Sequence, residues 1–248
     1  MVHLTETCDE GLPRLVAYAE ATAANVHEAT RTGAIHDALA AKDVAPSEHL
    51  VDAGYVSASH IVAARERHGV DLIGPARRNA SWQNRTEGAF GIDDFAVDWD
   101  RRKARCPEGN ESATWGEWKD KSGQPYIWVG FSLADCQPCP ARSRCTQAPS
   151  RRLGLHPRPE HEALAAARAR ESSAAGRRLY AQRRGIEGTL SQGVCACGLR
   201  RARYRGLTKV GLQSVATAAA LNLDRLGAWF ARRPLAPTRT SRFAALAA

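Results

Sequence analysis

The sequence predicts an α/β protein with a small β-rich insertion and a helical C-terminal part. Three observations carry this prediction. Residues 1–83 alternate extended and helical patterns, residues 84–150 hold four of the six tryptophans and four of the seven cysteines, and residues 157–231 follow a helical pattern. A chain of 248 residues can bury one sizeable core, or one core and a small inserted module.

Residues 1–83 are expected to form four short strands and two helices. The strands are expected at residues 3–7, 15–22, 49–52 and 70–74, and the helices at residues 35–42 and from a cap at Ser57 or Ser59 through residue 68. Strands that alternate with helices predict parallel pairing, at least from residue 46 onward.

The rest of the chain divides into an insertion, a helical part and a tail. Residues 84–150 contain several Gly, Pro and Asn turns and strand candidates at 95–99 and 126–131. Residues 151–233 are expected to be helical, because Glu160–Gln192 lacks proline and residues 207–230 carry an apolar stripe. The stripe consists of Leu212, Val215, Ala219, Leu223 and Leu226. The tail, residues 234–248, is expected to be loosely held.

Charge is distributed unevenly along the chain. Residues 1–60 hold three basic and nine acidic side chains, residues 61–150 are close to neutral, and residues 151–248 hold 19 basic against five acidic side chains. Eighteen of those 19 are arginine, whose planar fork matches phosphate oxygens. A polyanion such as nucleic acid is the partner that this pattern favours, although an arginine-rich proteome would also explain it.

No stretch of the sequence has the length and apolarity of a membrane span. The most apolar stretch, Val215–Leu223, is about half of the roughly 18 residues that a span needs. The N-terminus shows no basic region followed by an apolar core, so no secretory signal is visible. We therefore expect a cytoplasmic protein without a membrane partner.

Four cysteines form a candidate metal site. Cys136 and Cys139 have the C-x2-C spacing that lets two sulfurs bind one tetrahedral metal, Cys145 follows closely, and Cys106 precedes a second tight turn. Structural zinc is favoured over an iron–sulfur cluster or unligated thiols, because a small module without a large core needs a staple. The remaining cysteines, Cys8, Cys195 and Cys197, are interpreted as incidental thiols.

Two carboxylates, Asp52 and Glu187, are candidates for a catalytic or ligand-binding site. Asp52 is expected at the C-terminal end of a strand, the edge where ligands bind in α/β sheets. Tyr180, Arg183 and Glu187 are spaced i, i+3 and i+7 and share a helix face. A turn aspartate and an intrahelical Arg–Glu pair would explain both patterns without any function. Gly185 and Gly188 bracket the glutamate, however, and close approach of another backbone is one reason to tolerate them.

These residues carry a resemblance to DDE transposases of bacterial insertion sequences. Tyr180, Arg183 and Glu187 match the Y-(2)-R-(3)-E signature of that family, although Val194 stands where a lysine usually follows. The stretches VHLTETCD, EHLVDAGYVSA, VDLIGPAR, FSLADCQPCPARSRCT, RRGIEGTLSQG and RRARYRGLTKVGLQSVATAAALNL resemble, in this order, one transposase subfamily with a cysteine-bearing insertion.

The resemblance implies a fold, a substrate and a catalytic site. It implies an RNase H-like mixed sheet with flanking helices, transposon DNA ends as substrate, and magnesium held by an Asp-Asp-Glu triad. By that match Asp52 is the second carboxylate and Glu187 the third, while Tyr180 and Arg183 position the backbone or the glutamate. The loop that would hold phosphates contains Arg200, Arg201, Arg203, Arg205 and Lys209.

The first aspartate of the triad is not assigned. In the family it comes from the first strand of the fold, and neither Asp9 nor Asp37 matches that strand. We therefore expect a truncated transposase that alone neither cleaves nor joins DNA measurably. The alternative is a catalytically inactive, zinc-stapled DNA-binding fragment that modulates an intact transposase, either as a homo-oligomer or by pairing with it.

Overall fold

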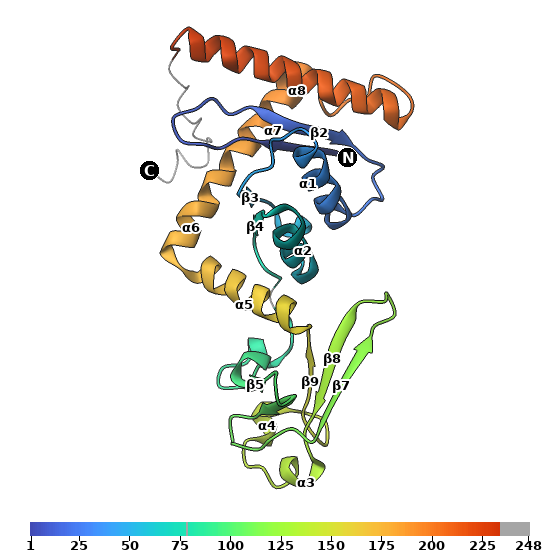
Figure 1. Ribbon diagram of the computed structural model, residues 1–248, viewed down its shortest axis with the longest axis vertical. Helices are drawn as coiled ribbons and strands as arrows, with labels where there is room; N and C mark the ends of the chain where they lie inside the picture. Colours follow the sequence, from blue (N-terminus) through green and yellow to red (C-terminus); the bar gives the residue numbers. More distant parts are fainter. Residues whose placement is uncertain (78, 234–248) are drawn as a thin grey trace, which may run out of the picture. The chain divides into compact units, whose positions relative to one another are not determined.

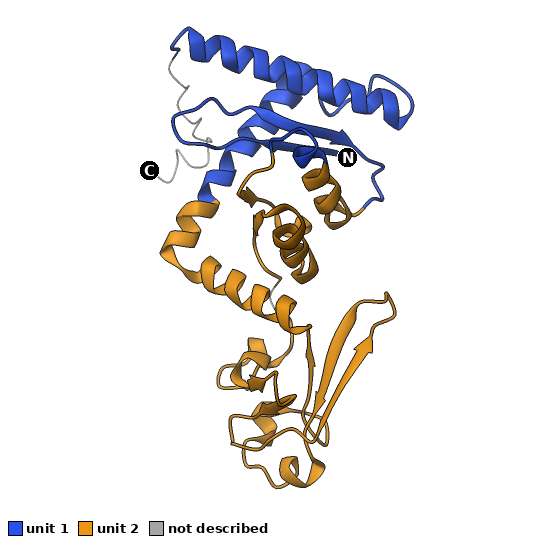
Figure 2. Cartoon of the chain, viewed as in Figure 1, with its two compact units in different colours: residues 1–26, 38–44, 181–248 blue, residues 27–37, 45–180 orange. Residues whose placement is uncertain are grey.

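A computed structural model of the protein describes residues 1–77 and 79–233, so the tail expected at 234–248 lies outside the described residues. The chain forms two compact units (Figure 2). Unit 1 contains Met1–Val26, Ala38–Val44 and Ala181–Ala248, and unit 2 contains His27–Asp37 and Ala45–Tyr180. The chain passes between the two units at several points, one of which falls inside helix α1, Thr32–Ala40.

Unit 1 is built on a β-hairpin and two helices (Figure 1). Strands β1 (Val2–Glu6) and β2 (Val16–Ala21) pair antiparallel, and helix α8 (Leu207–Phe230) packs against β2. The side chain of Asn222 bonds both backbone groups of Val16: its Oδ1 accepts from the N–H at 2.7 Å and its Nδ2 donates to the carbonyl at 3.0 Å. One α8 side chain therefore fixes the helix to the edge of the hairpin.

The apolar stripe of α8 is not the face that the helix buries. Leu212 and Leu223 are 70 % and 71 % exposed, and Val215 is also exposed. The buried positions are small or polar, with one exception, and consist of Ser214, Thr217, Ala218 and Leu221. Helix α7 (Gly185–Cys197) packs against both α8 and β1.

A parallel βαβ element forms one core of unit 2. Strand β3 (Glu48–Leu50) pairs parallel with β4 (Asp71–Ile73), and α2 (Ala58–His68) connects them, which confirms the expected parallel pairing. Ser57 caps α2, because its Oγ accepts the N–H of His60 at 3.1 Å. The buried residues of this core are Val51, Ala58, Ile61, Ala64, Val70, Leu72, Ala76 and Leu164.

The cysteine-bearing part of unit 2 has a separate core. Its three-stranded antiparallel sheet consists of β7 (Thr114–Lys119), β8 (Pro125–Gly130) and β9 (Arg152–Leu155). A short β-ladder and two short helices accompany the sheet: β5 (Ala96–Asp98), β6 (Lys103–Arg105), α3 (Leu133–Cys136) and α4 (Arg142–Cys145). Because β9 pairs with β8, this β structure extends past residue 150, where the insertion was expected to end.

Two further expectations differ from the structure. Among the described residues the strands form four separate small sheets rather than one mixed sheet. The helix expected over 160–192 is divided into α5 (Arg158–Ser172), α6 (Ala174–Ala181), a 3-10 turn (Gln182–Arg184) and α7. Ser173 breaks it by adopting an extended backbone, and its Oγ accepts from the N–H of Gly176 at 2.9 Å.

Short 3-10 turns complete the described elements at Glu28–Arg31, Ala53–Tyr55, Gln83–Arg85 and Ile92–Asp94. In the described part of the chain no helix combines the length and apolarity needed to cross a membrane.

Candidate functional site

Asp52 lies at the end of the β3 ladder with its side chain exposed. The preceding residue, Val51, still donates its N–H to the carbonyl of Ile73 at 2.8 Å, and Asp52 then starts the 3-10 turn Ala53–Tyr55. Its side chain makes no capping bond to that turn. A Cβ on Gly54 would collide with the Glu28 carboxylate, so a larger residue in the turn after Asp52 would displace the Glu28 side chain.

Tyr180 contacts the same strand end. Its hydroxyl donates to the carbonyl of Val51 at 3.3 Å, one residue before Asp52. A side chain on Gly74 would lie 2.6 Å from that carbonyl oxygen, so the position directly after β4 needs a glycine. The turn that carries Asp52 is thus held from two sides, by a ring from α6 and by the end of β4.

An open hollow of about 640 Å³ lies beside this strand end in unit 2. It is lined by the end of β4, by Tyr180, and by three arginines that no sequence pattern indicated: Arg168, Arg170 and Arg177. Arg170 donates to Asp71 at 2.7 Å, and Arg168 lies 3.7 Å from Asp93. No local sequence signal could identify these arginines, because only the folding of α5, with Arg168 and Arg170, and of α6, with Arg177, brings them to this hollow.

Arg183 and Glu187 belong to unit 1 and form an ion pair of 3.5 Å. The Arg183 side chain is 16 % exposed, whereas the Glu187 side chain is 69 % exposed, so a mostly buried cation holds an accessible carboxylate. Gly185 leaves room for the Arg14 guanidinium rather than for another backbone, and nothing lies within 4 Å of a Cβ placed on Gly188. The expected close approach to these glycines is therefore found only at Gly185, and it is made by a side chain rather than by a backbone.

The signature residues are distributed over the two units. Asp52 and Tyr180 belong to unit 2, and Arg183 and Glu187 belong to unit 1. Tyr180, Arg183 and Glu187 do not share one uninterrupted α-helix, because they lie in α6, in the 3-10 turn and in α7 respectively. In the described residues no group of three or more His, Cys, Asp or Glu side chains is arranged to hold a metal ion.

The expected phosphate-binding residues are all exposed: four lie in the basic loop between α7 and α8, and the fifth, Lys209, lies in the first turn of α8. These are Arg200, Arg201, Arg203, Arg205 and Lys209. Gln213 of α8 orders the loop backbone: it accepts from the N–H of Arg203 at 3.0 Å and donates to the carbonyl of Arg201 at 2.8 Å. The cations of the loop are therefore carried by a backbone that hydrogen bonds to Gln213 fix in place.

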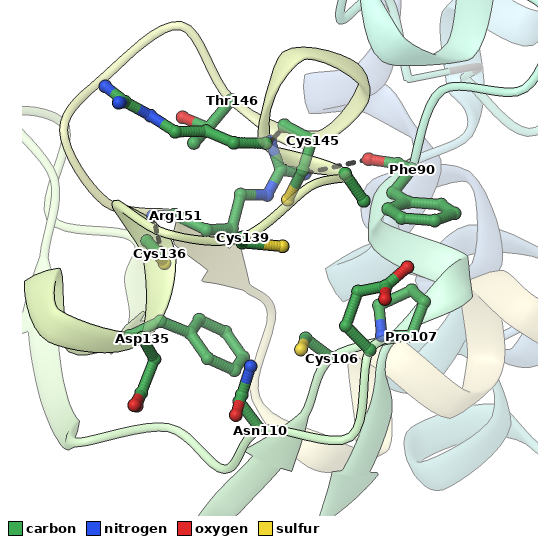
Figure 3. Close-up of a pocket in the computed structure, with 14 residues that line it drawn as sticks. Phe90, Cys106, Pro107, Asn110, Asp135, Cys136, Cys139, Cys145, Thr146 and Arg151 are labelled. Atoms are coloured by element: carbon green, nitrogen blue, oxygen red, sulfur yellow. Dashed lines mark hydrogen bonds between the residues drawn. The ribbon is translucent and has the colours of Figure 1, made fainter.

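The four candidate metal-binding cysteines line one small pocket of about 30 Å³ (Figure 3). Cys136 and Cys139 come from α3 and the turn after it, Cys145 ends α4, and Cys106 follows β6. All four are half-buried. In Figure 3 the sulfurs of Cys106, Cys139 and Cys145 face the space between them.

Arg151 closes the pocket and was missed from the sequence. Its backbone N–H donates to the sulfur of Cys136 at 3.5 Å, and its guanidinium donates to the carbonyl of Cys145 at 2.9 Å. Burial raises the pKa of the Cys145 thiol, the Arg151 charge opposes that shift, and the neighbouring thiols add to it. Burial lowers the pKa of the Arg151 guanidinium, whose Nε has no hydrogen-bond partner among the described residues. The thiols are grouped, although their sulfurs are not in the arrangement of a bound metal.

Together these features define a basic α/β protein with accessible carboxylates, an ordered arginine-rich loop and a cysteine pocket. Residues 105–227 match the family model described as Transposase DDE domain, and the chain therefore carries part of a transposase DDE domain. The matched range includes the pocket cysteines, Tyr180, Arg183, Glu187 and the basic loop, whereas Asp52 lies outside it. No curated protein and no solved structure matches the chain.

Proposed function

We propose that the protein acts in DNA transposition as a DDE transposase that cleaves and joins DNA at element ends in the cytoplasm. The observation that carries the proposal is the family match over residues 105–227, which includes Glu187 on an exposed helix turn. The match also supports an RNase H-like arrangement of the catalytic part and DNA as the substrate. Recognition of paired DNA ends would involve a homo-oligomer or a pair with an intact transposase.

The carboxylates of Asp52 and Glu187 would hold magnesium. Bound divalent metal ions supply an activated water or 3′-hydroxyl and stabilise the leaving oxygen of the phosphodiester. Arg183 orients the Glu187 carboxylate by its 3.5 Å ion pair, and Tyr180 holds the backbone directly before Asp52 by its bond to the Val51 carbonyl. These two are positioning residues, and the exposed basic loop would bind the flanking phosphates.

The test is a magnesium-dependent cleavage assay on a supercoiled plasmid that carries the DNA flanking the gene on both sides. Glu187→Gln and Asp52→Asn should each lower cleavage by a factor of at least about 100, because each removes a charged metal ligand. Glu162→Gln is the matched control, since this glutamate lies exposed on α5 in an ion pair with Arg158. Cleavage that survives both active-site substitutions would refute the catalytic assignment.

A second candidate function is DNA binding without catalysis. It is favoured by one observation, namely that the loop between α7 and α8 exposes its arginines on a backbone that Gln213 holds. In the same assay this alternative predicts no cleavage by the chain alone, together with retained binding to the plasmid ends. Loss of both cleavage and binding would exclude both candidates.

We also propose a structural zinc in the cysteine pocket. The four thiols that line it are soft ligands, and the donation from the Arg151 N–H to Cys136 resembles the outer-shell bonds that orient metal-binding sulfurs. Small side-chain rotations would be needed, because the sulfurs are not in coordination geometry. A zinc ion there would add a cross-link beside the small core against which Cys106, Cys136 and Cys145 pack.

Metal analysis of the purified protein tests the zinc proposal. We expect about one zinc per chain, loss of that zinc in Cys139→Ser, and a lower thermal midpoint after chelation. Cys197→Ser is the control, since Cys197 lies in α7, in the other unit. If the protein contains no metal, and neither the chelator nor Cys139→Ser changes its thermal midpoint, the thiols in this pocket are unligated.

A further inference from the structure

The outward face of the β7–β8–β9 sheet carries aromatic side chains that no part of the proposed catalytic function uses. In the register of the sheet Gly116 pairs with Trp128, which pairs with Gly154, and Trp118 pairs with Tyr126. Directly paired residues of antiparallel strands project to the same side of a sheet. The opposite side faces the core, where Ile127, Val129, Leu153 and Leu155 are buried.

Two of these aromatic side chains are open to solvent. Trp118 is 61 % exposed and Trp128 is 37 % exposed, while Tyr126 beside them is half-buried. Large apolar side chains that gather on one exposed face mark an interaction site more often than scattered ones do. We call this surface the aromatic face, and it consists of Trp118, Tyr126, Trp128 and Arg152.

Glycines keep the aromatic face flat on both sides of Trp128. A Cβ on Gly116 would lie 2.8 Å from Nε1 of Trp118, so the Trp118 indole lies over this glycine. A Cβ on Gly154 would meet nothing within 4 Å, so the space beside Trp128 is open on the β9 side. Glycine weakens a strand interior, and its use at paired positions often marks the close approach of a ligand.

The aromatic face is positively charged at one edge. The Arg152 guanidinium lies 5.6 Å from the centre of the Trp128 ring, and its side chain is exposed. No carboxylate occupies the strand positions that project to this side, which are Thr114, Gly116, Trp118, Tyr126, Trp128, Gly130, Arg152 and Gly154. Flat rings next to a cation, without an anion, match a ligand that combines π-faces with negative charge.

We propose that the aromatic face binds unpaired nucleobases of single-stranded DNA, with Trp118 and Trp128 stacking on bases and Arg152 contacting a phosphate. Stacking of bases on aromatic rings is strong and tolerant of sequence, and an arginine beside the rings adds an electrostatic contact. The choice of DNA over other flat ligands rests on the proposed transposase function. Strand ends opened during cleavage would be the substrate that this surface holds.

Fluorescence anisotropy with a labelled 15-nucleotide oligothymidine and a labelled hairpin duplex tests the inference. Trp118→Ala and Trp128→Ala should each weaken binding of the single strand by about tenfold, with little change in duplex binding. The slope of log K against log salt should become shallower in Arg152→Gln, by the amount that corresponds to about one phosphate contact. The tryptophan variants should leave this slope unchanged. Trp229→Ala in α8 is the matched control, since Trp229 is also exposed but lies on another element.

Trp118→Phe keeps an aromatic ring and should retain most of the affinity, which separates stacking from a loss of folding. If both alanine variants bind the single strand with wild-type affinity, the inference is wrong. The proposed function is unaffected by that result if the variants still bind the duplex. A change in sedimentation on replacing Trp118 overturns it in favour of an interface between copies. Failure of the wild-type chain to bind either DNA refutes this inference and DNA binding together.

Discussion

At the scale of single residues, the carboxylate of Glu6 is a buried charge of unit 1 held by two partners. Its side chain is 5 % exposed and lies 3.1 Å from the Arg225 guanidinium, which also donates to the carbonyl of Arg14 at 2.8 Å. The hydroxyl of Thr189 donates to the same carboxylate. Removing one partner of a buried ion pair leaves an uncompensated charge, which is more costly than losing the pair as a whole.

We therefore expect Arg225→Met to lower the free energy of unfolding by about 3–5 kcal/mol. Urea unfolding followed by circular dichroism measures this. Arg158→Met is the control, because Arg158 forms an exposed pair with Glu162 and should change stability much less. The double variant Glu6→Leu/Arg225→Met should recover much of the loss, and an equally unstable double variant would contradict the explanation.

Two buried histidines in unit 2 make stability depend on pH. Nε2 of His36 and Nδ1 of His49 lie 3.0 Å apart, so at least one ring must be neutral for this hydrogen bond to form. Burial lowers the pKa of both rings to about 4, and a neighbouring histidine charge adds to the shift in each, from His68 for His36 and from His36 for His49. Asp37 opposes the shift at His36 and also lies 3.2 Å from His68.

Because the folded pKa values lie below the ordinary value of 6.5, the unfolded chain binds more protons between pH 6.5 and 4. The stabilisation is present above pH 6.5 and is lost as pH falls toward 4, by an amount on the order of a few kcal/mol. Thermal midpoints measured from pH 7.5 to 4.5 should fall for the wild type and fall less for His36→Asn. His156→Asn, at an exposed position, should follow the wild-type curve. Parallel curves for all three proteins would exclude the pair as the cause.

The sequence predicted contacts between residues that are close in the chain, but it did not predict contacts between distant residues. The Ser57 cap was readable because a cap involves residues three apart in the chain. The Glu6–Arg225 pair joins residues 219 positions apart, and no spacing rule reaches that far. The same limit hid Arg151 beside the cysteines and Arg170 beside β4, so the sequence predicted candidate ligands but not the groups that surround them.

At the scale of elements, α8 shows that sequence periodicity can predict a helix without predicting which of its faces is buried. The expected helix over 207–230 agrees with Leu207–Phe230 in the structure, because helix formation is largely a local property. The apolar stripe lies on the exposed side, since Ser214, Thr217 and Ala218 allow the close packing against β2. Periodicity identified a helix and an apolar face, but it could not identify which face packs.

This arrangement predicts different effects for two leucines of one helix. Leu221 is 2 % exposed, so Leu221→Ala should destabilise the chain by about 2–5 kcal/mol. Leu212 is 70 % exposed, so Leu212→Ala should change stability by less than about 0.5 kcal/mol. Chemical unfolding of both variants at one protein concentration measures the contrast. Equal destabilisation would mean that the exposed stripe is covered in solution.

At the scale of the whole molecule, the α/β class was predictable but the sheet arrangement was not. The order of β3, α2 and β4 indicated a parallel pair, because a crossover helix leaves few alternatives. Strands β6, β7 and β9 were missed, since β7 and β9 carry glycines, and two of the three residues of β6 are charged. Which strands share a sheet depends on contacts between distant segments, so one mixed sheet was expected where the described residues form four.

Charge is the whole-molecule property with the most direct consequence for DNA binding. Some arginines elsewhere in the described chain are already paired with carboxylates, as Arg101 and Arg105 are with Glu111 and Arg102 is with Glu117. Within residues 1–77 and 79–233, by contrast, no carboxylate pairs with a cation of the loop Arg200–Lys209. Unpaired cations on a backbone held by Gln213 can exchange water and counterions for phosphates at little ordering cost.

The triple variant Arg201→Gln/Arg203→Gln/Arg205→Gln should therefore reduce the dependence of duplex affinity on salt. For each phosphate that the variant no longer neutralises, the slope of log K against log salt should become shallower by about 0.9. Titrations at several salt concentrations from 50 to 200 mM, roughly the range over which such slopes are resolved, measure it. The control Arg101→Gln/Arg102→Gln/Arg105→Gln removes the same charge from ion-paired positions and should keep the wild-type slope. If both triple variants reduce the slope equally, net charge attracts the DNA and the ordered loop has no special role; if only the loop variant does, the phosphates bind where the fold presents free arginines.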